Sequence, residues 1–182
     1  HRSYELFQKT FYWMLSKCML ISPKHKFRFK NPLYSLDASL IHLCLSLYDW
    51  AKFRTTKGAV KLHLKLNHAG YLPAFCVLTT GKVPDQKIAP SVPFEKGDVV
   101  ICDKGYTDFS WYKTLDDKGV YFVTRLKDNA HYKVTSRNKT DSLKNIYSDQ
   151  VIKFKRSRKR FPNPLRRIRS KDQETGKIIT IL

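Results

Sequence analysis

The first twenty residues carry apolar side chains at helical spacing. Ser3 is a suitable N-cap, and the pattern ends before Pro23, so the sequence predicts one amphipathic helix over residues 3–20. Because an apolar helical stripe usually faces a protein core, we expect this one to be packed, although it could also face a partner or a membrane. The stripe consists of Leu6, Phe7, Phe11, Met14, Leu15, Cys18 and Met19.

Strict alternation of apolar and polar residues makes 59–67 the clearest strand in the sequence. Val60, Leu62, Leu64 and Leu66 alternate with Lys61, His63, Lys65 and Asn67, which predicts one buried face and one basic, solvent-facing surface. A turn at 68–70 and an apolar run at 71–80 complete a predicted hairpin. A shorter strand, with Asp37 near its end, is expected over 33–39.

The next segments predict strands and helices in alternation. A fully apolar run between Asp98 and Asp103 is typical of a central strand buried on both faces. A helix over 108–117 and a buried strand over 120–126 follow, and 172–176 reads as a hairpin turn between two short strands. The order of elements up to residue 126 matches an α/β, RNase H-like core.

Composition indicates one folded and strongly basic domain. The chain has 182 residues, of which 42% are hydrophobic and 13% aromatic, which excludes a disordered basic tail. Against 15 acidic residues it has 35 Lys and Arg, a net charge of +20 that points to a polyanionic partner. Ten of the basic residues lie within 151–171, where there is no acid.

Cysteine spacing and hydropathy indicate the compartment. The four cysteines are far apart with no C-x-x-C pair, which argues against a zinc ribbon or a disulfide scaffold and favours a reducing, cytosolic setting. No apolar run is long enough for a membrane span, and no signal peptide is recognisable. Both ends of the chain look cut from something longer.

Two carboxylates lie in or directly after apolar strands, where an unpaired charge is costly. They are Asp37 and Asp103. If their strands are neighbours, both acids emerge at one edge of a sheet and could share a divalent cation, with Mg²⁺ or Mn²⁺ preferred by oxygen ligands. The alternative from spacing alone is that both are strand-end acids paired with lysines.

Several motifs together resemble the insertion-sequence-four group of DDE transposases. They are Asp37-Ala-Ser-Leu-Ile, Trp50-Ala-Lys-Phe-Arg-Thr-Thr-Lys-Gly-Ala-Val-Lys-Leu-His63, Gly70-Tyr-Leu-Pro-Ala, Gly81-Lys-Val and Asp103-Lys-Gly-Tyr-Thr-Asp-Phe-Ser-Trp-Tyr. The resemblance runs from about His1 to the end of the chain. It implies that Asp37 and Asp103 are the first two acids of the DDE triad and hold the metal.

The resemblance also implies an RNase H-like mixed sheet with flanking helices and a C-terminal all-β insertion that is incomplete. We expect an N-terminal helix and basic linker at 1–30, the catalytic core at 31–128 and the basic insertion at 129–182. The implied reaction is attack of metal-activated water on a transposon-end phosphodiester, followed by strand transfer from the freed 3′-hydroxyl. The implied partners are double-stranded DNA, at transposon ends and target, and a second copy of the chain, in a prokaryotic cytoplasm at the nucleoid.

The third acid of the family lies on a helix with a Tyr, Arg, Glu, Lys signature that this sequence lacks. Glu174 is the only Glu after Asp103, and its Asp-Gln-Glu-Thr-Gly context is a turn, so we do not expect it to be catalytic. The chain is therefore expected to be truncated and inactive alone. Two alternatives remain open: a non-catalytic basic DNA-binding remnant, and an RNase H-like nuclease that only hydrolyses.

Basic residues of the predicted hairpin, of the position after Asp103 and of the 151–171 segment are candidates for contact with DNA phosphates. The alternative is that they belong to an ordinary solvated surface or loop. His63 could instead bind zinc with His68, but no further ligand has suitable spacing. Asp49 and Asp85 are read as a helix-end acid and a loop acid rather than metal ligands. The DNA-binding candidates are Lys57, Lys61, His63, Lys104, Arg156, Arg158, Lys159, Arg160, Arg166 and Arg167.

Overall fold

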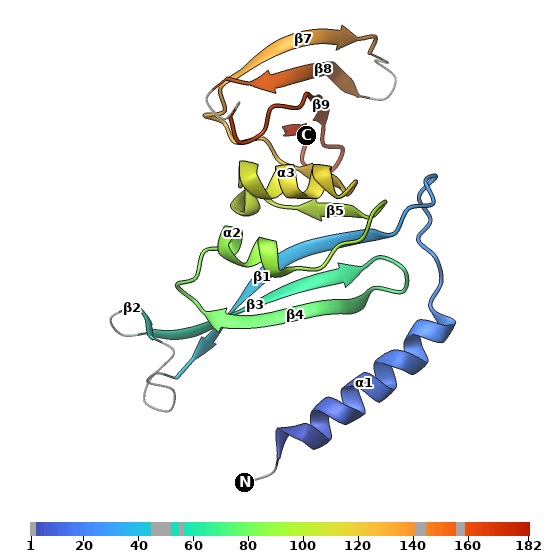
Figure 1. Cartoon of the computed structure of the whole chain (residues 1–182), viewed down its shortest axis with the longest axis vertical. Helices are drawn as coiled ribbons and strands as arrows, with labels where there is room; N and C mark the ends of the chain where they lie inside the picture. The colour runs from blue at the N-terminus through green and yellow to red at the C-terminus, as the bar shows by residue number, and fades with distance from the viewer. Residues whose placement is uncertain (1–2, 45–51, 55–56, 141–144, 156–158) are drawn as a thin grey trace. The chain divides into compact units, whose positions relative to one another are not determined.

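The computed structural model describes residues 3–44, 52–54, 57–140, 145–155 and 159–182 (Figure 1). The chain divides into two compact units, residues 1–83 and 84–182. Within the described residues, the first unit holds one helix and four strands, and the second holds the remaining elements.

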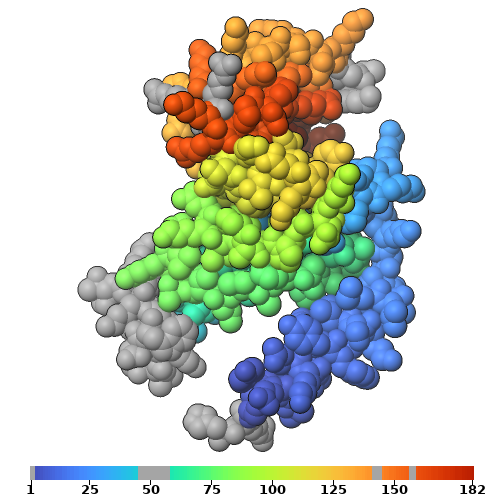
Figure 2. Space-filling view, in the orientation of Figure 1, coloured from blue at the N-terminus to red at the C-terminus, as the bar shows by residue number. Residues whose placement is uncertain are grey.

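Helix α1, Tyr4–Ile21, forms where the apolar spacing predicted it, and the Ser3 hydroxyl accepts a hydrogen bond from the Glu5 N–H at 3.2 Å. The expectation that its apolar stripe packs into a core is wrong, because none of its residues is buried and Phe7 is 64% exposed. In Figure 2 no other described segment covers the blue atoms of this helix on the face in view. Only its C-terminal half approaches the sheet, where Leu15 and Met19 line a hollow together with Pro73. Among the helices that the structure describes, none is long and apolar enough to cross a bilayer.

The sheet of the first unit is built around strand β3, Lys57–Asn67. On one side β3 pairs antiparallel with β1, Leu33–Leu43, and it also pairs antiparallel with β4, Leu72–Thr80, which confirms the predicted hairpin. A short strand, β2 (Lys52–Arg54), pairs with the beginning of β3. Strand β1 is longer than predicted, because its residues up to Leu43 continue the ladder opposite Gly58.

The polar side of β3 is not the solvent-facing surface that alternation predicted. His63 is 1% exposed and Lys65 is 6% exposed, whereas Leu62 and Leu64 are only half-buried. The Lys65 ammonium lies 3.9 Å from the centre of the Tyr34 ring, a cation–π contact that compensates its burial. Alternation therefore identified the strand and its two faces, but the polar face is buried at His63 and Lys65, and of the apolar residues that alternate with them only Val60 is buried.

The second unit begins with helix α2 (Asp85–Ile88) and contains a strand–helix–strand crossover. Strands β5 (Val99–Cys102) and β6 (Tyr121–Thr124) are parallel, and helix α3 (Phe109–Asp117) connects them. The Asp108 carboxylate caps α3 by accepting hydrogen bonds from the Ser110 and Trp111 N–H groups at 2.7 and 3.0 Å. The core of this crossover is formed by Val100, Tyr106, Trp111, Tyr112 and Leu115, all less than 5% exposed.

Strands β5 and β6 are less buried than their apolar sequences predicted. Ile101 is 37% exposed and Tyr121 is 63% exposed, although Val100 is fully buried. The expectation of strands buried on both faces is therefore wrong at these two positions. An apolar run shows that a strand can be covered on both faces, but the neighbouring elements decide whether it is.

The C-terminal part of the second unit is a four-stranded antiparallel sheet in the order β7-β8-β9-β10, which agrees with the predicted β-rich insertion. Its strands are Tyr132–Asn138, Ile146–Phe154, Leu165–Lys171 and Ile178–Ile181. Phe154 packs edge-on against Phe109 of α3 at 4.6 Å between ring centres. The predicted hairpin turn at 172–176 is present, with Gly176 at φ +69°.

Strand β10 returns the insertion to the end of β6. Arg125 and Ile181 form an antiparallel bridge, and the Leu182 N–H donates to the Thr124 carbonyl at 2.9 Å. The Leu126 N–H donates to the Thr180 carbonyl at 3.0 Å. The chain therefore leaves β6, forms the four-stranded sheet and returns beside the end of β6.

Candidate active site

Asp103 lies at the carboxyl end of β5 and begins a tight 3-10 turn over Lys104–Tyr106. Its Oδ1 accepts a hydrogen bond from the Gly105 N–H at 2.7 Å, and its backbone carbonyl accepts one from the Thr124 hydroxyl at 3.2 Å. Tyr106, the last residue of the turn, is fully buried and anchors the turn in the core, while the Asp103 side chain is exposed. The carboxylate is thus both accessible and held in one orientation.

A second carboxylate approaches the same turn from α2. A Cβ atom placed on Gly105 would lie 2.8 Å from Asp103 Oδ1 and 3.1 Å from Asp85 Oδ2. A side chain at position 105 would therefore displace at least one carboxylate, so the space at this position favours glycine. The arrangement also concentrates negative charge beside Gly105, which favours the approach of a cation.

Asp37 belongs to the first unit and lies opposite Leu64 in the β1–β3 ladder. Its side chain is exposed, and its Oδ1 accepts a hydrogen bond from the Ala38 N–H at 2.8 Å. Asp37 lies within β1 and Asp103 directly follows β5, and both side chains are exposed. Within the residues that the structure describes, no three His, Cys, Asp or Glu side chains are grouped as a metal site.

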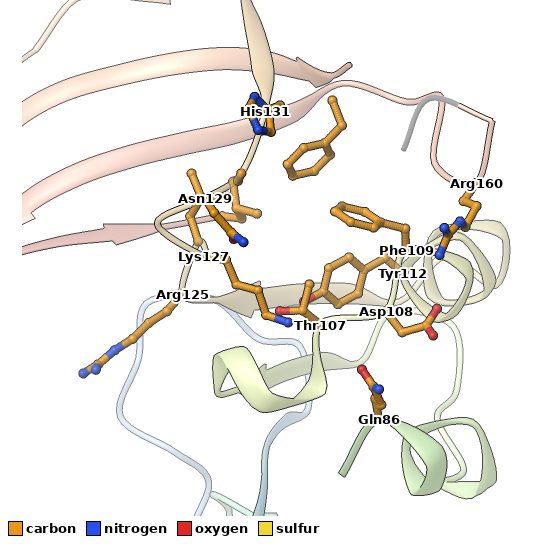
Figure 3. A pocket seen from close by; sticks show the side chains of 14 residues that line it. Gln86, Thr107, Asp108, Phe109, Tyr112, Arg125, Lys127, Asn129, His131 and Arg160 are labelled. Carbon is orange, nitrogen blue, oxygen red and sulfur yellow. The ribbon is translucent and has the colours of Figure 1, made fainter. Parts of the chain in front are cut away.

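A cavity of about 370 Å³ opens beside the segment that follows Asp103 (Figure 3). The rings of Phe109 and Tyr112 lie side by side in it, and the Tyr112 phenol points toward Thr107. Burial raises the pKa of Tyr112 to about 12, with the Thr107 and Thr124 hydroxyls opposing that rise, so the phenol stays protonated at neutral pH.

Basic and amide side chains line the same cavity, although the Arg125 guanidinium points away from the two rings (Figure 3). They come from the segment after β6 and from the loop before β9, and they include Arg125, Lys127, Asn129, His131 and Arg160. Asp108 also lines the cavity, but its Oδ1 is engaged as the α3 cap. Such a combination of rings and cations can hold a phosphate group together with an apolar or aromatic moiety.

Four of the predicted DNA-binding residues precede the C-terminal segment in the sequence. Lys61 donates from Nζ to the Val83 carbonyl at 2.9 Å, and Lys104 lies 4.0 Å from an Asp128 carboxylate oxygen with both side chains exposed. His63 is buried and its Nε2 is 3.1 Å from the Thr79 hydroxyl, so the expectation that its side chain faces solvent is wrong, while its contact with DNA stays a prediction. The side chain of Lys57 lies outside what the structure describes.

The remaining candidates lie in the insertion. Arg156 and Arg158 fall outside the described residues, and Lys159 and Arg160 are exposed. Arg166 forms a two-pronged ion pair with Asp149, at 2.6 Å from Nη2 to Oδ2 and 3.0 Å from Nε to Oδ1, and this pair lowers the pKa of Asp149.

Arg167 is also engaged within the sheet. It donates to Gln150 at 2.9 Å and lies over the Tyr132 ring. Glu174 lies in the 172–176 turn, as the sequence predicted, and its N–H donates to Asp172. Among the described candidates of the insertion, Lys159 and Arg160 therefore offer the most accessible positive charge.

Asp85 was not predicted as a neighbour of Asp103, and the cavity-lining residues Arg125, Lys127 and His131 were not predicted as site residues. Arg125 and Lys127 directly follow the apolar β6 run, at the carboxyl end of the strand parallel to β5. The rule that singled out Asp103, a charged residue just after a buried strand, could have found them. Asp85 gave no such signal, because its approach depends on how α2 packs.

Comparison with known proteins gives three results. The sequence model of a family described as "Transposase DDE domain" matches residues 28–180. The curated protein "Putative transposase y4zB" of Sinorhizobium fredii is 27% identical over 141 residues, which are 75% of this chain and 39% of that protein. The chain therefore spans about two fifths of the length of this relative. A cryo-EM structure of a piggyBac transposase synaptic complex with hairpin DNA aligns with 96% of this chain and 36% of its own, at 13% identity and a TM-score of 0.45.

Proposed function

This chain belongs to the transposase DDE domain family, and we propose that it carries the first two acids of a DNA transposase catalytic centre, Asp37 and Asp103. The family match covers both residues. The observation that carries the proposal is Asp103 itself, an exposed carboxylate at the end of a parallel strand, held by the Gly105 N–H. Assignment to the insertion-sequence-four group is supported by the motifs around these two acids.

We further propose an RNase H-like core that contains both Asp37 and Asp103. The antiparallel strands β1, β3 and β4, followed by the β5-α3-β6 crossover, have the element order of that fold. The proposed boundaries are the N-terminal helix and linker at 1–30, the core at 31–128 and the insertion at 129–182.

The chemistry of the two acids fits Mg²⁺ or Mn²⁺, because both offer exposed carboxylate oxygens, the ligands that hard divalent cations prefer. When bound, such an ion lowers the pKa of a water molecule and stabilises charge on a phosphodiester. Asp37 and Asp103 would hold it, and the Gly105 N–H would keep Asp103 Oδ1 in place. The cations of the cavity beside Thr107 would hold a phosphate of the cleaved strand.

Double-stranded DNA, as transposon end and target, is the proposed substrate. The net charge of +20 supports it, since a polyanion is the natural partner of so basic a chain. A homodimer on DNA and a location at a prokaryotic nucleoid are proposed together with this function.

Strand cleavage by the full-length gene product that carries this domain, on DNA with the element's own ends, tests the proposal. We expect Asp37→Asn or Asp103→Asn to reduce the cleavage rate by about a thousandfold, since loss of metal-based stabilisation costs several kcal/mol. Asp117→Asn is the matched control, because Asp117 is an exposed acid paired with Lys113. Cleavage that survives either substitution at full rate would show that these acids are not catalytic.

A further inference from the structure

The segment between α1 and β1 alternates basic and aromatic residues. It reads Lys24-His25-Lys26-Phe27-Arg28-Phe29-Lys30, and we call residues 22–32 the linker. No Asp or Glu occurs between Glu5 and Asp37, so no acid near in sequence offsets this charge. Cations interleaved with rings are the composition of surfaces that bind single-stranded nucleic acid.

Two phenylalanines of the linker are open to solvent. Phe27 is 55% exposed and Phe29 is 39% exposed, although Phe is usually buried. Their rings are stacked, with centres 5.6 Å apart and planes at 21°, and the His25 ring lies 5.7 and 5.0 Å from them. The result is an exposed aromatic platform in which the ring planes of the phenylalanines are already aligned.

Two cavities adjoin this platform. One of about 400 Å³ is lined by Lys24, His25, Phe27, His68 and Tyr71, and Tyr71 is 69% exposed. A second, of about 320 Å³, is lined by His25, Phe27, Phe29, Tyr34 and Asn67, among others. Volumes of this size admit a flat heterocycle and leave the adjacent ammonium and guanidinium groups near solvent.

Local contacts hold the platform in place. His25 Nε2 lies 2.8 Å from the Asn31 carbonyl, which closes the linker into a loop. Gly70 has φ +74°, and a Cβ there would collide with the Ser22 side chain, so the β3–β4 turn lies directly against the linker. Tyr71 has φ +55°, a left-handed conformation that is uncommon for a bulky residue. The rings are thus arranged before any ligand binds.

We propose that the linker and the β3–β4 turn bind an unpaired DNA strand. Its bases stack on Phe27, Phe29 and Tyr71, and its phosphates contact the basic residues Lys24, Lys26, Arg28 and Lys30. A duplex cannot use the rings, because neighbouring base pairs already cover the faces of its bases. An acidic peptide would satisfy the cations but offers nothing flat to stack on the rings. The inference rests on the proposed function only in naming DNA as the partner.

Fluorescence anisotropy of the chain with labelled oligothymidine and with a duplex of equal length, both in EDTA, tests the proposal. Stacking contributes about 1–3 kcal/mol per base, so Phe27→Ala and Phe29→Ala should each weaken single-strand binding by roughly 5- to 150-fold. Duplex binding should change by less than about twofold. Tyr147→Ala is the matched control, since Tyr147 is a 56% exposed ring in β8.

Two further variants separate stacking from loss of fold and from charge alone. Phe27→Leu keeps an apolar side chain but removes the flat ring, so it should also lose single-strand affinity. Phe27→Trp should keep that affinity, and its indole emission should be quenched by the single strand but not by the duplex. Single-strand affinity unchanged in Phe27→Leu and Phe29→Ala, or an equal loss for single strand and duplex, would overturn the proposal.

The metal-free conditions keep this test separate from catalysis. Asp103→Asn should bind oligothymidine like the parent chain, whatever its effect on cleavage. If Asp103→Asn leaves cleavage intact while Phe27→Leu loses single-strand binding, the proposed catalytic acids fail and the stacking platform stands. If Asp103→Asn abolishes cleavage while Phe27→Leu keeps single-strand binding, the platform fails and the catalytic proposal stands.

Discussion

His68 shows how the environment of one residue sets its titration. Its Nε2 lies 2.7 Å from the Ser35 hydroxyl, and burial, followed by the nearby His25, lowers its pKa below the ordinary value of 6.5. As the pH falls, the unfolded chain therefore takes up this proton first. The neutral His68 ring therefore contributes fully to the stability of the fold at pH values above the pKa of the unfolded chain. This contribution is lost as the pH falls through the pKa of His68 in the folded chain.

NMR titration of the His68 ring protons measures this shift. We expect His25→Ala to raise the pKa of His68 toward its ordinary value by removing the like charge, while burial keeps part of the shift. His131→Ala, a change of an exposed histidine in the other unit, should leave the titration of His68 unchanged. A pKa of His68 that is the same in His25→Ala and the parent would contradict the assignment.

At the scale of elements, the ion pair of Asp149 and Arg166 joins β8 to β9. Asp149 is 6% exposed and also accepts a hydrogen bond from the Asn138 amide at 3.0 Å, whereas the Arg166 side chain is largely exposed. Removing the buried acceptor should destabilise the sheet by about 1–3 kcal/mol, because charged hydrogen bonds are lost. Urea unfolding of Asp149→Ala measures this, with Asp128→Ala, a fully exposed acid, as the neutral control. An equal midpoint for both variants would show that the pair contributes nothing.

The elements that sequence predicted well are those set by local pattern. Helix α1, the β3–β4 hairpin, helix α3 and the 172–176 turn each depend on spacing or turn chemistry within a few residues. The burial of their faces was predicted poorly: no residue of α1 is buried, and the polar face of β3 is buried at His63 and Lys65. Periodicity reports that two faces differ, whereas burial depends on which distant elements cover each face.

The same distinction applies to the candidate site. Asp103 could be predicted because a charged residue directly after an apolar strand is a local signal. The proximity of Asp85 could not, because it requires α2 to pack beside the 104–106 turn, a contact across almost twenty residues of chain. The sequence indicated only a basic linker before β1, and the stacked, exposed rings of Phe27 and Phe29 were not predicted.

For the whole molecule, the structure divides the basic residues into those already engaged within the protein and those free to meet DNA. Arg166 is paired with Asp149, whereas Lys159 and Arg160 are exposed and Arg160 lines the cavity beside α3. Each phosphate contact changes the logarithmic salt slope of duplex binding by about 0.9. Lys159→Gln combined with Arg160→Gln should therefore lower the slope by up to about 2, measured from 50 to 300 mM salt. Arg166→Gln should leave it unchanged, because its charge is neutralised within the sheet, and an equal fall in both variants would mean that Arg166 leaves Asp149 to contact DNA.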